Sequence, residues 1–205
     1  EFSDSANLGV SVSGSTYNIL VNDEVVARDI PLVYLGGRVG LTTWNSSVGF
    51  DDISVVSPFA DQPIDQTSEV DLFANPRPVN TYFTADLGSE TDPANWGIVN
   101  GDWEFSAEGI THPNAEWFDN LIMHANPYDN YSFVTNMRMG EGEGGAGVAF
   151  NIPAADTING AHIARYLGDD VLTWGYFDDG GVNVEQGTAE VEARSEEHTS
   201  ELQSR

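Results

Sequence analysis

Apolar side chains alternate with small or polar ones through most of this chain, in short stretches separated by Gly, Asn and Asp. The first stretches cover residues 8–12, 17–21 and 25–26, with turn residues at 14–15 and 22–23 between them. In an extended strand every second side chain lies on the same face, so a period of two predicts strands with one buried face. Helical spacing is nearly absent. The sequence therefore predicts an all-β fold, an antiparallel sandwich of two sheets.

Two further turns predict hairpins later in the chain. Asn100-Gly101 lies between two stretches of alternating aromatic residues, and Asn-Gly suits a type I′ turn because both of its central residues need a positive φ. Residues 168–170 (Gly-Asp-Asp) separate the alternating stretches 161–167 and 171–177. We expect each pair of stretches to form neighbouring antiparallel strands.

A bulge is predicted near residue 51. Phe50 and Ile53 both continue an inward-facing apolar pattern, but they are an odd number of residues apart. An extra residue at Asp51-Asp52 is the simplest way to return the pattern to the same face.

The alternation stops in residues 57–80, which hold several of the prolines and no glycine. We interpret this segment as a semi-rigid linker between residues 1–56 and residues 81–193. Residues 194–205 (RSEEHTSELQSR) resemble the in-frame translation of a common Illumina sequencing adapter, and we expect them to be a disordered artefact. On this interpretation both ends of the natural chain are cut.

The charge of the chain restricts its partners. The formal net charge is −26, every basic residue is Arg, and Cys is absent. Nucleic acids and anionic membranes require basic surfaces, so neither is an expected partner. The longest apolar runs, such as residues 30–35, are far too short to span a membrane. Without Cys there is neither a disulfide nor a thiolate metal site. This composition suits a secreted bacterial β module or a cytosolic protein of a salt-accumulating halophile.

Two parts of the sequence resemble one domain family. Residues 16–55 contain TYNILVNDEVV and GGRVGLTTWNSSVGFDDISV, which resemble the C-terminal end of concanavalin A-like, or laminin G-like, jelly-roll modules. Residues 83–150 contain NWGIVNGDWEFSAEGI and YDNYSFVTNMRMGEGEGGAGVAFNI, which resemble the N-terminal end of such modules. The ending precedes the beginning. The chain is thus either a slice of a tandem array or a sandwich closed in permuted order, with residues 1–56 paired to residues 81–193.

The resemblance implies an extracellular or cell-surface location and favours the secreted alternative. It implies a non-catalytic module of a large bacterial repeat protein, which binds a glycan or cell-surface polysaccharide, or mediates adhesion, beside neighbouring modules of the same chain. Two alternatives stay open: a fragment of an enzyme domain like family 16 or keto-disaccharide glycoside hydrolases, and a structural spacer.

No catalytic residue is predicted. Family 16 glycoside hydrolases carry two Glu on one strand in an ExDxE or ExDxxE pattern, because retaining hydrolysis needs two carboxyl groups about 5–5.5 Å apart. The nearest match, residues 69–74, lacks the second Glu and lies in the predicted linker. The sequence therefore leans against an enzyme.

Calcium is the cofactor that this composition allows. Ca²⁺ takes about six to eight oxygen ligands, and acidic residues stand in nearly every predicted turn. The resemblance implies a structural Ca²⁺ in some members, and it places the closing and opening strands side by side. We expect the ligands Asp51, Asp52 and Asp86, which flank those strands.

Aromatic and polar side chains of residues 161–177 supply the predicted ligand surface. Sugars stack on aromatic rings and form hydrogen bonds with polar groups. The predicted ligand-binding residues are His162, Arg165, Tyr166, Trp174 and Tyr176. Alternation places Arg165 on the strand face opposite to His162 and Tyr166. Core packing is the competing interpretation for each aromatic residue. Trp44 and Trp117 also stand beside polar loops.

Overall fold

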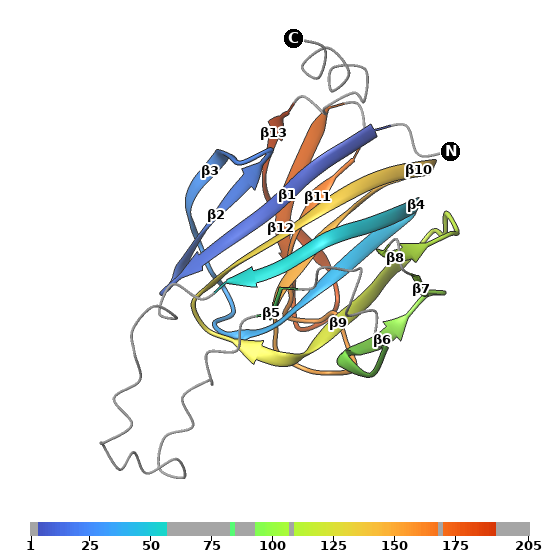
Figure 1. The fold of residues 1–205 in the computed structure, drawn as a ribbon. Coiled ribbons are helices and arrows are strands. Elements are labelled where there is room, and N and C mark those ends of the chain that lie inside the picture. The colour runs from blue at the N-terminus through green and yellow to red at the C-terminus, as the bar shows by residue number, and fades with distance from the viewer. Residues whose placement is uncertain (1–3, 57–82, 85–92, 107–108, 168–169, 192–205) are drawn as a thin grey trace.

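The computed structural model describes residues 4–56, 83–84, 93–106, 109–167 and 170–191 (Figure 1). The predicted linker, the adapter-like residues 194–205 and Asp86 lie outside the described residues. Most of the described chain is in β-strands, and its one helical element is a short 3₁₀ turn. In this part of the chain no helix is long and apolar enough to cross a membrane. The predicted all-β class is confirmed.

The strands follow one another with short connections over most of the chain. Their bounds are β1 (Asp4–Ser13), β2 (Thr16–Val21), β3 (Glu24–Pro31), β4 (Gly37–Val56), β5 (Phe83–Thr84), β6 (Trp96–Asn100), β7 (Glu104–Ser106), β8 (Gly109–His112), β9 (Asp119–Tyr128), β10 (Tyr131–Ile152), β11 (His162–Tyr166), β12 (Val171–Phe177) and β13 (Asn183–Glu190), with the 3₁₀ turn η1 (Pro93–Asn95) before β6.

Two long strands, β4 and β10, organise the fold. They pair antiparallel along their whole length, from Ser132 opposite Val56 to Ile152 opposite Arg38. On its other edge β10 pairs first with β1 and then with β11. Likewise β4 pairs with β5 and β8 in its second half and with β9 in its first half. Both strands therefore pass from one sheet of the sandwich into the other.

The two sheets share β4 and β10 and differ in the strands that flank this pair. The first sheet has the order β3-β2-β1-β10-β4-β8-β7, and the second has the order β13-β12-β11-β10-β4-β9-β6. In Figure 1 β1 and β10 cross in front of β11 and β12. This arrangement is the predicted antiparallel two-sheet sandwich, of jelly-roll type. Strands from residues 4–56 and from residues 83–191 contribute to both sheets, while their assignment to two modules stays a prediction.

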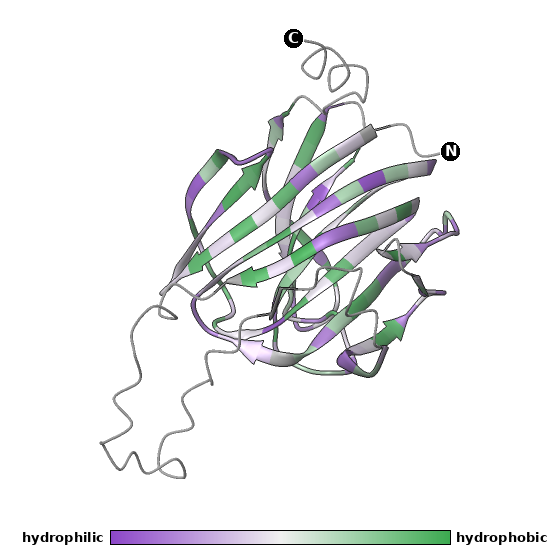
Figure 2. Cartoon of the chain, viewed as in Figure 1, coloured by the Kyte–Doolittle hydropathy of each residue, from purple (hydrophilic) through white to green (hydrophobic). Residues whose placement is uncertain are grey.

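The core lies between the two sheets. The predicted alternation is confirmed in β1 and β2, where the inward side chains are buried: Leu8, Val10, Val12, Tyr17, Ile19 and Val21. Figure 2 shows the same alternation as apolar and polar bands across the strands. The largest fully buried side chains include Tyr17, Tyr131, Phe50, Phe133 and Phe150. Burying each large apolar side chain contributes roughly 1.5–3 kcal/mol, so burial of the aromatic and aliphatic core together is a major source of stability.

The turn predicted at residues 22–23 is confirmed. Asn22 and Asp23 have φ values of 52° and 68°, as a type I′ turn between β2 and β3 requires. The hairpin across residues 168–170 is present as the β11–β12 pair. The bulge is also present, because Val134 pairs with Ser54 whereas Asn136 pairs with Asp51, and Asp52 has a φ of 46°.

The predicted hairpin at Asn100-Gly101 is wrong. Strand β6 pairs with β9 in the second sheet, and β7 pairs with β8 in the first sheet. Gly101, with a φ of 88°, turns the chain from one sheet to the other. The Asn100 side chain accepts a hydrogen bond from the Leu121 backbone N–H at 3.0 Å, which fixes this corner to β9. Trp96 and Trp103 are both buried, but Ile98 is 51 % exposed, so the alternation does not mark one buried face here.

Side chains tie the outer strands of the two sheets together. The Tyr17 hydroxyl on β2 donates a hydrogen bond to Gln186 Oε1 on β13 at 2.9 Å. Gln186 Nε2 donates in turn to the Pro31 carbonyl at the end of β3 at 3.2 Å. Along this side the sandwich is closed by side chains, whereas β4 and β10 connect the sheets through the backbone.

The bend of β4 and β10 depends on glycine. The register of this pair shifts between Met139 and Gly142 and again before Gly145. A Cβ atom at Gly144 would lie closer to the Trp44 carbonyl oxygen than any real Cβ contact, and that atom is backbone, which cannot rotate away. Gly144 thus allows the two strands to approach at the corner.

We predict that Gly144→Ala lowers the free energy of unfolding by about 1–3 kcal/mol, since an extra methyl in this contact forces a backbone shift. Gly97→Ala is the matched control, because its Cβ would meet Met123 at an ordinary 3.9 Å. Urea denaturation of the two variants measures the difference. Equal stability of both would show that the corner tolerates a side chain.

Candidate ligand-binding face

The structure divides the sequence-predicted ligand residues between two faces. His162 is opposite Tyr176, and Tyr166 is opposite Leu172, so their side chains lie on the inward face of the β11–β12 pair. Trp174 packs against the same core and lies over Gly187. Arg165, between them in sequence, lies on the outer face. The opposition of Arg165 to His162 and Tyr166 was predicted from alternation.

His162 anchors a loop within the core. Its ring stacks on Phe150 with centroids 5.4 Å apart, and it is fully buried. The backbone N–H groups of Val33 and Tyr34 both donate to His162 Nε2, at 3.1 and 3.2 Å. Since Nε2 accepts these bonds, the ring proton lies on Nδ1 and the imidazole is neutral. Burial lowers the pKa of His162 to about 4.

This shift predicts acid sensitivity. The pKa of His162 is lower in the folded protein than its ordinary value of 6.5, so the unfolded chain takes up the proton first. The contribution of His162 to the free energy of unfolding is fully present above pH 6.5. It is lost as the pH falls towards 4, by at most about 1.4 kcal/mol per pH unit. His162→Gln keeps an acceptor near the Nε2 position and cannot titrate. We expect the unfolding free energy of the variant to fall less steeply across this range than that of the wild type, and parallel pH curves would contradict this.

On the outer face of the second sheet, Arg165 forms a buried polar contact. Its Nη2 donates to Thr42 Oγ1 at 2.8 Å and forms an ion pair with the Asp119 carboxylate. The Phe177 ring centroid lies 5.7 Å from the guanidinium carbon. Burial lowers the pKa of Arg165 below its usual range, and Asp119 opposes that shift. The guanidinium remains charged, with its charge balanced by Asp119.

A glycine makes this contact possible. Gly147 on β10 stands between Thr42 on β4 and Arg165 on β11 in the strand register. A Cβ at this position would lie only 2.9 Å from the Arg165 Cα. Because Gly147 carries no side chain, the Arg165 side chain can extend over β10 to the residues beyond it.

Aromatic side chains border the Arg165 contact. Trp44 is the cross-strand partner of Asp119, so the two side chains lie on the same face. The Trp117 ring meets the Trp44 ring edge-on, with centroids 5.7 Å apart. Trp117 is 71 % exposed and Phe118 is 50 % exposed, so two adjacent aromatic side chains face solvent and form a patch. We call Trp44, Trp117 and Phe118 the aromatic rim.

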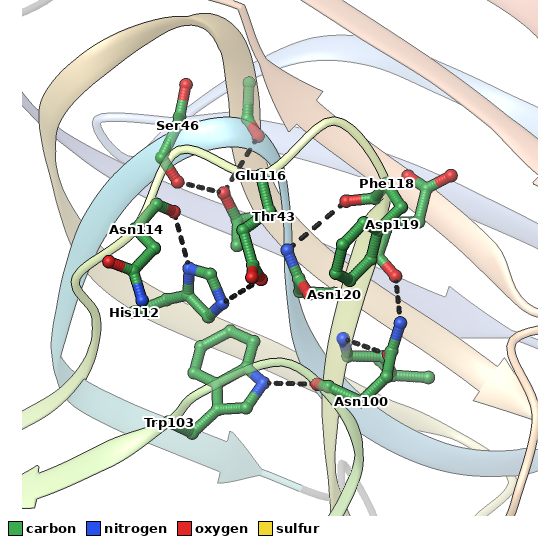
Figure 3. A network of polar contacts seen from close by, with 12 residues as sticks. Thr43, Ser46, Asn100, Trp103, His112, Asn114, Glu116, Phe118, Asp119 and Asn120 are labelled. Atoms are coloured by element: carbon green, nitrogen blue, oxygen red, sulfur yellow. Dashed lines mark hydrogen bonds and ion pairs between the residues drawn. The ribbon is translucent and has the colours of Figure 1, made fainter.

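The loop that carries Trp117 and Phe118 is held by a network of polar contacts (Figure 3). The Asn45 backbone N–H donates to the Glu116 carbonyl at 2.7 Å. Asn120 Nδ2 donates to the Phe118 carbonyl at 3.2 Å. His112 contacts the backbone of Asn114 and the carboxylate of Glu116. The exposed rings therefore extend from a backbone with several fixed points.

The predicted calcium ligands have other partners in the structure. The Asp51 carboxylate lies 3.1 Å from Arg138 Nη2, and Asp52 Oδ2 accepts a hydrogen bond from Asn136 at 2.6 Å. Burial raises the pKa of Asp51, and Arg138 opposes this shift. Asp86 lies outside the described residues. Among the residues described here, no group of three His, Asp or Glu side chains could hold a metal ion. Calcium binding stays a prediction.

The sequence matches no protein-family model and no curated protein. Sequence reasoning included Arg165 and noted Trp44 and Trp117, but it missed Asp119 and Thr42. The available signal was the run Trp117-Phe118-Asp119, in which two aromatic residues precede an acid just before a strand.

The Arg165–Asp119 pair gives a direct test of this face. Arg165→Met removes the cation and leaves Asp119 without its partner, so we expect a loss of roughly 3 kcal/mol in unfolding free energy. Adding Asp119→Asn to that variant removes the uncompensated charge and should restore part of the loss. Chemical denaturation of the two single variants and the double variant gives the coupling energy. A coupling near zero would mean that the pair is not formed.

Proposed function

We propose that this chain is a non-catalytic carbohydrate-binding or adhesion module, and that it binds glycans at the aromatic rim and the adjoining Arg165 contact. The observation that carries the proposal is the exposure of Trp117, with its ring fixed against Trp44. A rigid exposed indole offers an apolar platform for the face of a sugar ring. Asp119, whose side chain is 28 % exposed, lies beside it and offers carboxylate oxygens, while the buried Arg165, which is itself bonded to Thr42, holds that carboxylate.

Partners of the acidic residues support binding over hydrolysis. Retaining and inverting glycoside hydrolases use two carboxyl groups that face the scissile bond. Here Asp119 pairs with Arg165, and Glu116 contacts His112. Carboxylates held in this way serve better to orient a ligand than to exchange protons with it. If no glycan binds, the two alternatives are a fragment of a hydrolase-like domain and a structural spacer.

The sequence motifs place the proposal in a wider context. Their resemblance to concanavalin A-like modules supports a secreted or cell-surface bacterial repeat protein, with neighbouring modules of the same chain as further partners. In that setting Ca²⁺ acts as a structural ion, so binding is to be measured both with added Ca²⁺ and with a chelator.

Electrostatics favours neutral glycans. The chain has a formal net charge of −26, and the charge of Arg165 is already balanced by Asp119. An acidic polysaccharide would approach against this field, and the described residues of the site offer it no unpaired cation. Neutral polysaccharides meet no such repulsion.

We predict that Trp117→Ala weakens binding to a neutral glycan about tenfold, a change that corresponds to loss of about 1.4 kcal/mol of stacking energy. Leu35→Ala is the matched control, because Leu35 is 67 % exposed on a different loop. A glycan array that includes neutral and acidic polysaccharides identifies the ligand, and calorimetry then measures its affinity for each variant. The proposal fails if the folded protein binds no glycan with or without Ca²⁺, or if both variants bind as the wild type does.

A further inference from the structure

His112 lies at the centre of the network that holds the aromatic rim. It is fully buried at the end of β8, directly before the loop that carries Trp117 and Phe118. Its Nδ1 lies 2.9 Å from the Asn114 carbonyl oxygen. A carbonyl oxygen only accepts hydrogen bonds, so Nδ1 carries a proton. Figure 3 shows the ring between Asn114 and Glu116, above the Trp103 ring.

The second ring nitrogen also faces oxygen. Nε2 of His112 lies 3.4 Å from Glu116 Oε2. A Cβ atom at Gly101 would lie 2.8 Å from this Nε2 and 2.6 Å from Asn120 Oδ1, so the amide oxygen borders the same space. These three atoms are buried and have no hydrogen bond in the described chain. A neutral ring with its proton on Nδ1 would direct a lone pair at the carboxylate, whereas an imidazolium directs an N–H group there.

Other surroundings of His112 are uncharged. The Trp103 ring meets the His112 ring edge-on, with centroids 5.0 Å apart. The cross-strand partner of His112 on β4 is Val48. Asp102 and Glu104, which flank Trp103, are both exposed. Glu116 is therefore the one charged group in contact with the ring among the described residues.

We propose that His112 is a positioning residue that holds the Trp117 loop as an imidazolium, so that loss of its proton loosens the loop and weakens ligand binding. Deprotonation replaces an N–H group facing the Glu116 carboxylate with a lone pair facing it. The contact then changes from attraction to repulsion inside a buried site. Two other fixed points, at the Glu116 and Phe118 carbonyls, remain and keep the loop attached.

The consequence for binding rests on the proposed function, while the consequence for the loop does not. Because the attractive contact needs the second ring proton, the site would bind more tightly in mildly acidic than in mildly alkaline surroundings. Trp117 is the side chain through which the change would reach the ligand.

The test measures the loop first, without any glycan. Hydrogen–deuterium exchange of the Asn45 backbone N–H, which donates to the Glu116 carbonyl and so reports the attachment of the loop, is measured at pH 5.5 and pH 8 and corrected for intrinsic exchange rates. It should show about fivefold weaker protection at pH 8 in the wild type. Glu116→Gln is the informative variant, because its amide can donate to a neutral Nε2. It should keep the loop protected at both values of pH. His112→Asn keeps a donor for the Asn114 carbonyl but lacks Nε2, and should show weak protection at both.

Ring protonation and ligand binding complete the experiment. Nitrogen NMR of the His112 ring should report a doubly protonated ring at pH 5.5. A neutral ring at that pH, or wild-type loop protection that is equal at both values, overturns the inference. If the loop responds to pH as expected but no glycan binds, the proposed function fails and the inference stands. If a glycan binds at the rim with the same affinity at both values, the link from His112 to binding is wrong.

Discussion

The antiparallel pairing of β4 with β10 is the interaction on which the rest of this structure depends. Each strand belongs to both sheets, so the backbone hydrogen bonds that join them also fix how the sheets face each other. The aromatic core then fills a space whose width and angle are already set. In many sandwiches side-chain packing alone holds the two layers together. Here the layers share a continuous ladder, and the glycines at its bend are as important to the fold as the apolar residues of the core.

The same ladder explains where the candidate ligand face lies. Trp44 stands at the bend of β4, and the pairing of β4 with β9 brings Asp119 beside it. Arg165 reaches this point from β11 only because β10 presents Gly147 between them. A cation, an acid and exposed aromatic rings from three separate parts of the chain thus meet at one corner. They lie close together because of the strand topology and because Gly147 carries no side chain.

Much of the fold could be predicted because its signals are local. The alternation in β1 and β2 and the positive φ at Asn22-Asp23 depend only on neighbouring residues. The hairpin expected at Asn100-Gly101 failed because the same local pattern also suits a chain that changes sheets, and the deciding contact, from Asn100 to Leu121, is distant in sequence. For the same reason Arg165 was found by its residue type, whereas Asp119 and Thr42 were not, since only the strand register brings them to it.

Gln186, which ties β13 to the opposite sheet, also bears on solubility. An outer strand with free backbone groups is a template on which another chain can add a strand. Hydrogen bonds from Tyr17 to Gln186 and from Gln186 to Pro31 draw the last strands of the two sheets towards each other. Acidic side chains such as Glu185 and Glu190 on β13 repel a second copy of the same edge. These features oppose the addition of further strands at this edge, which is the step by which strand-rich chains form fibrils.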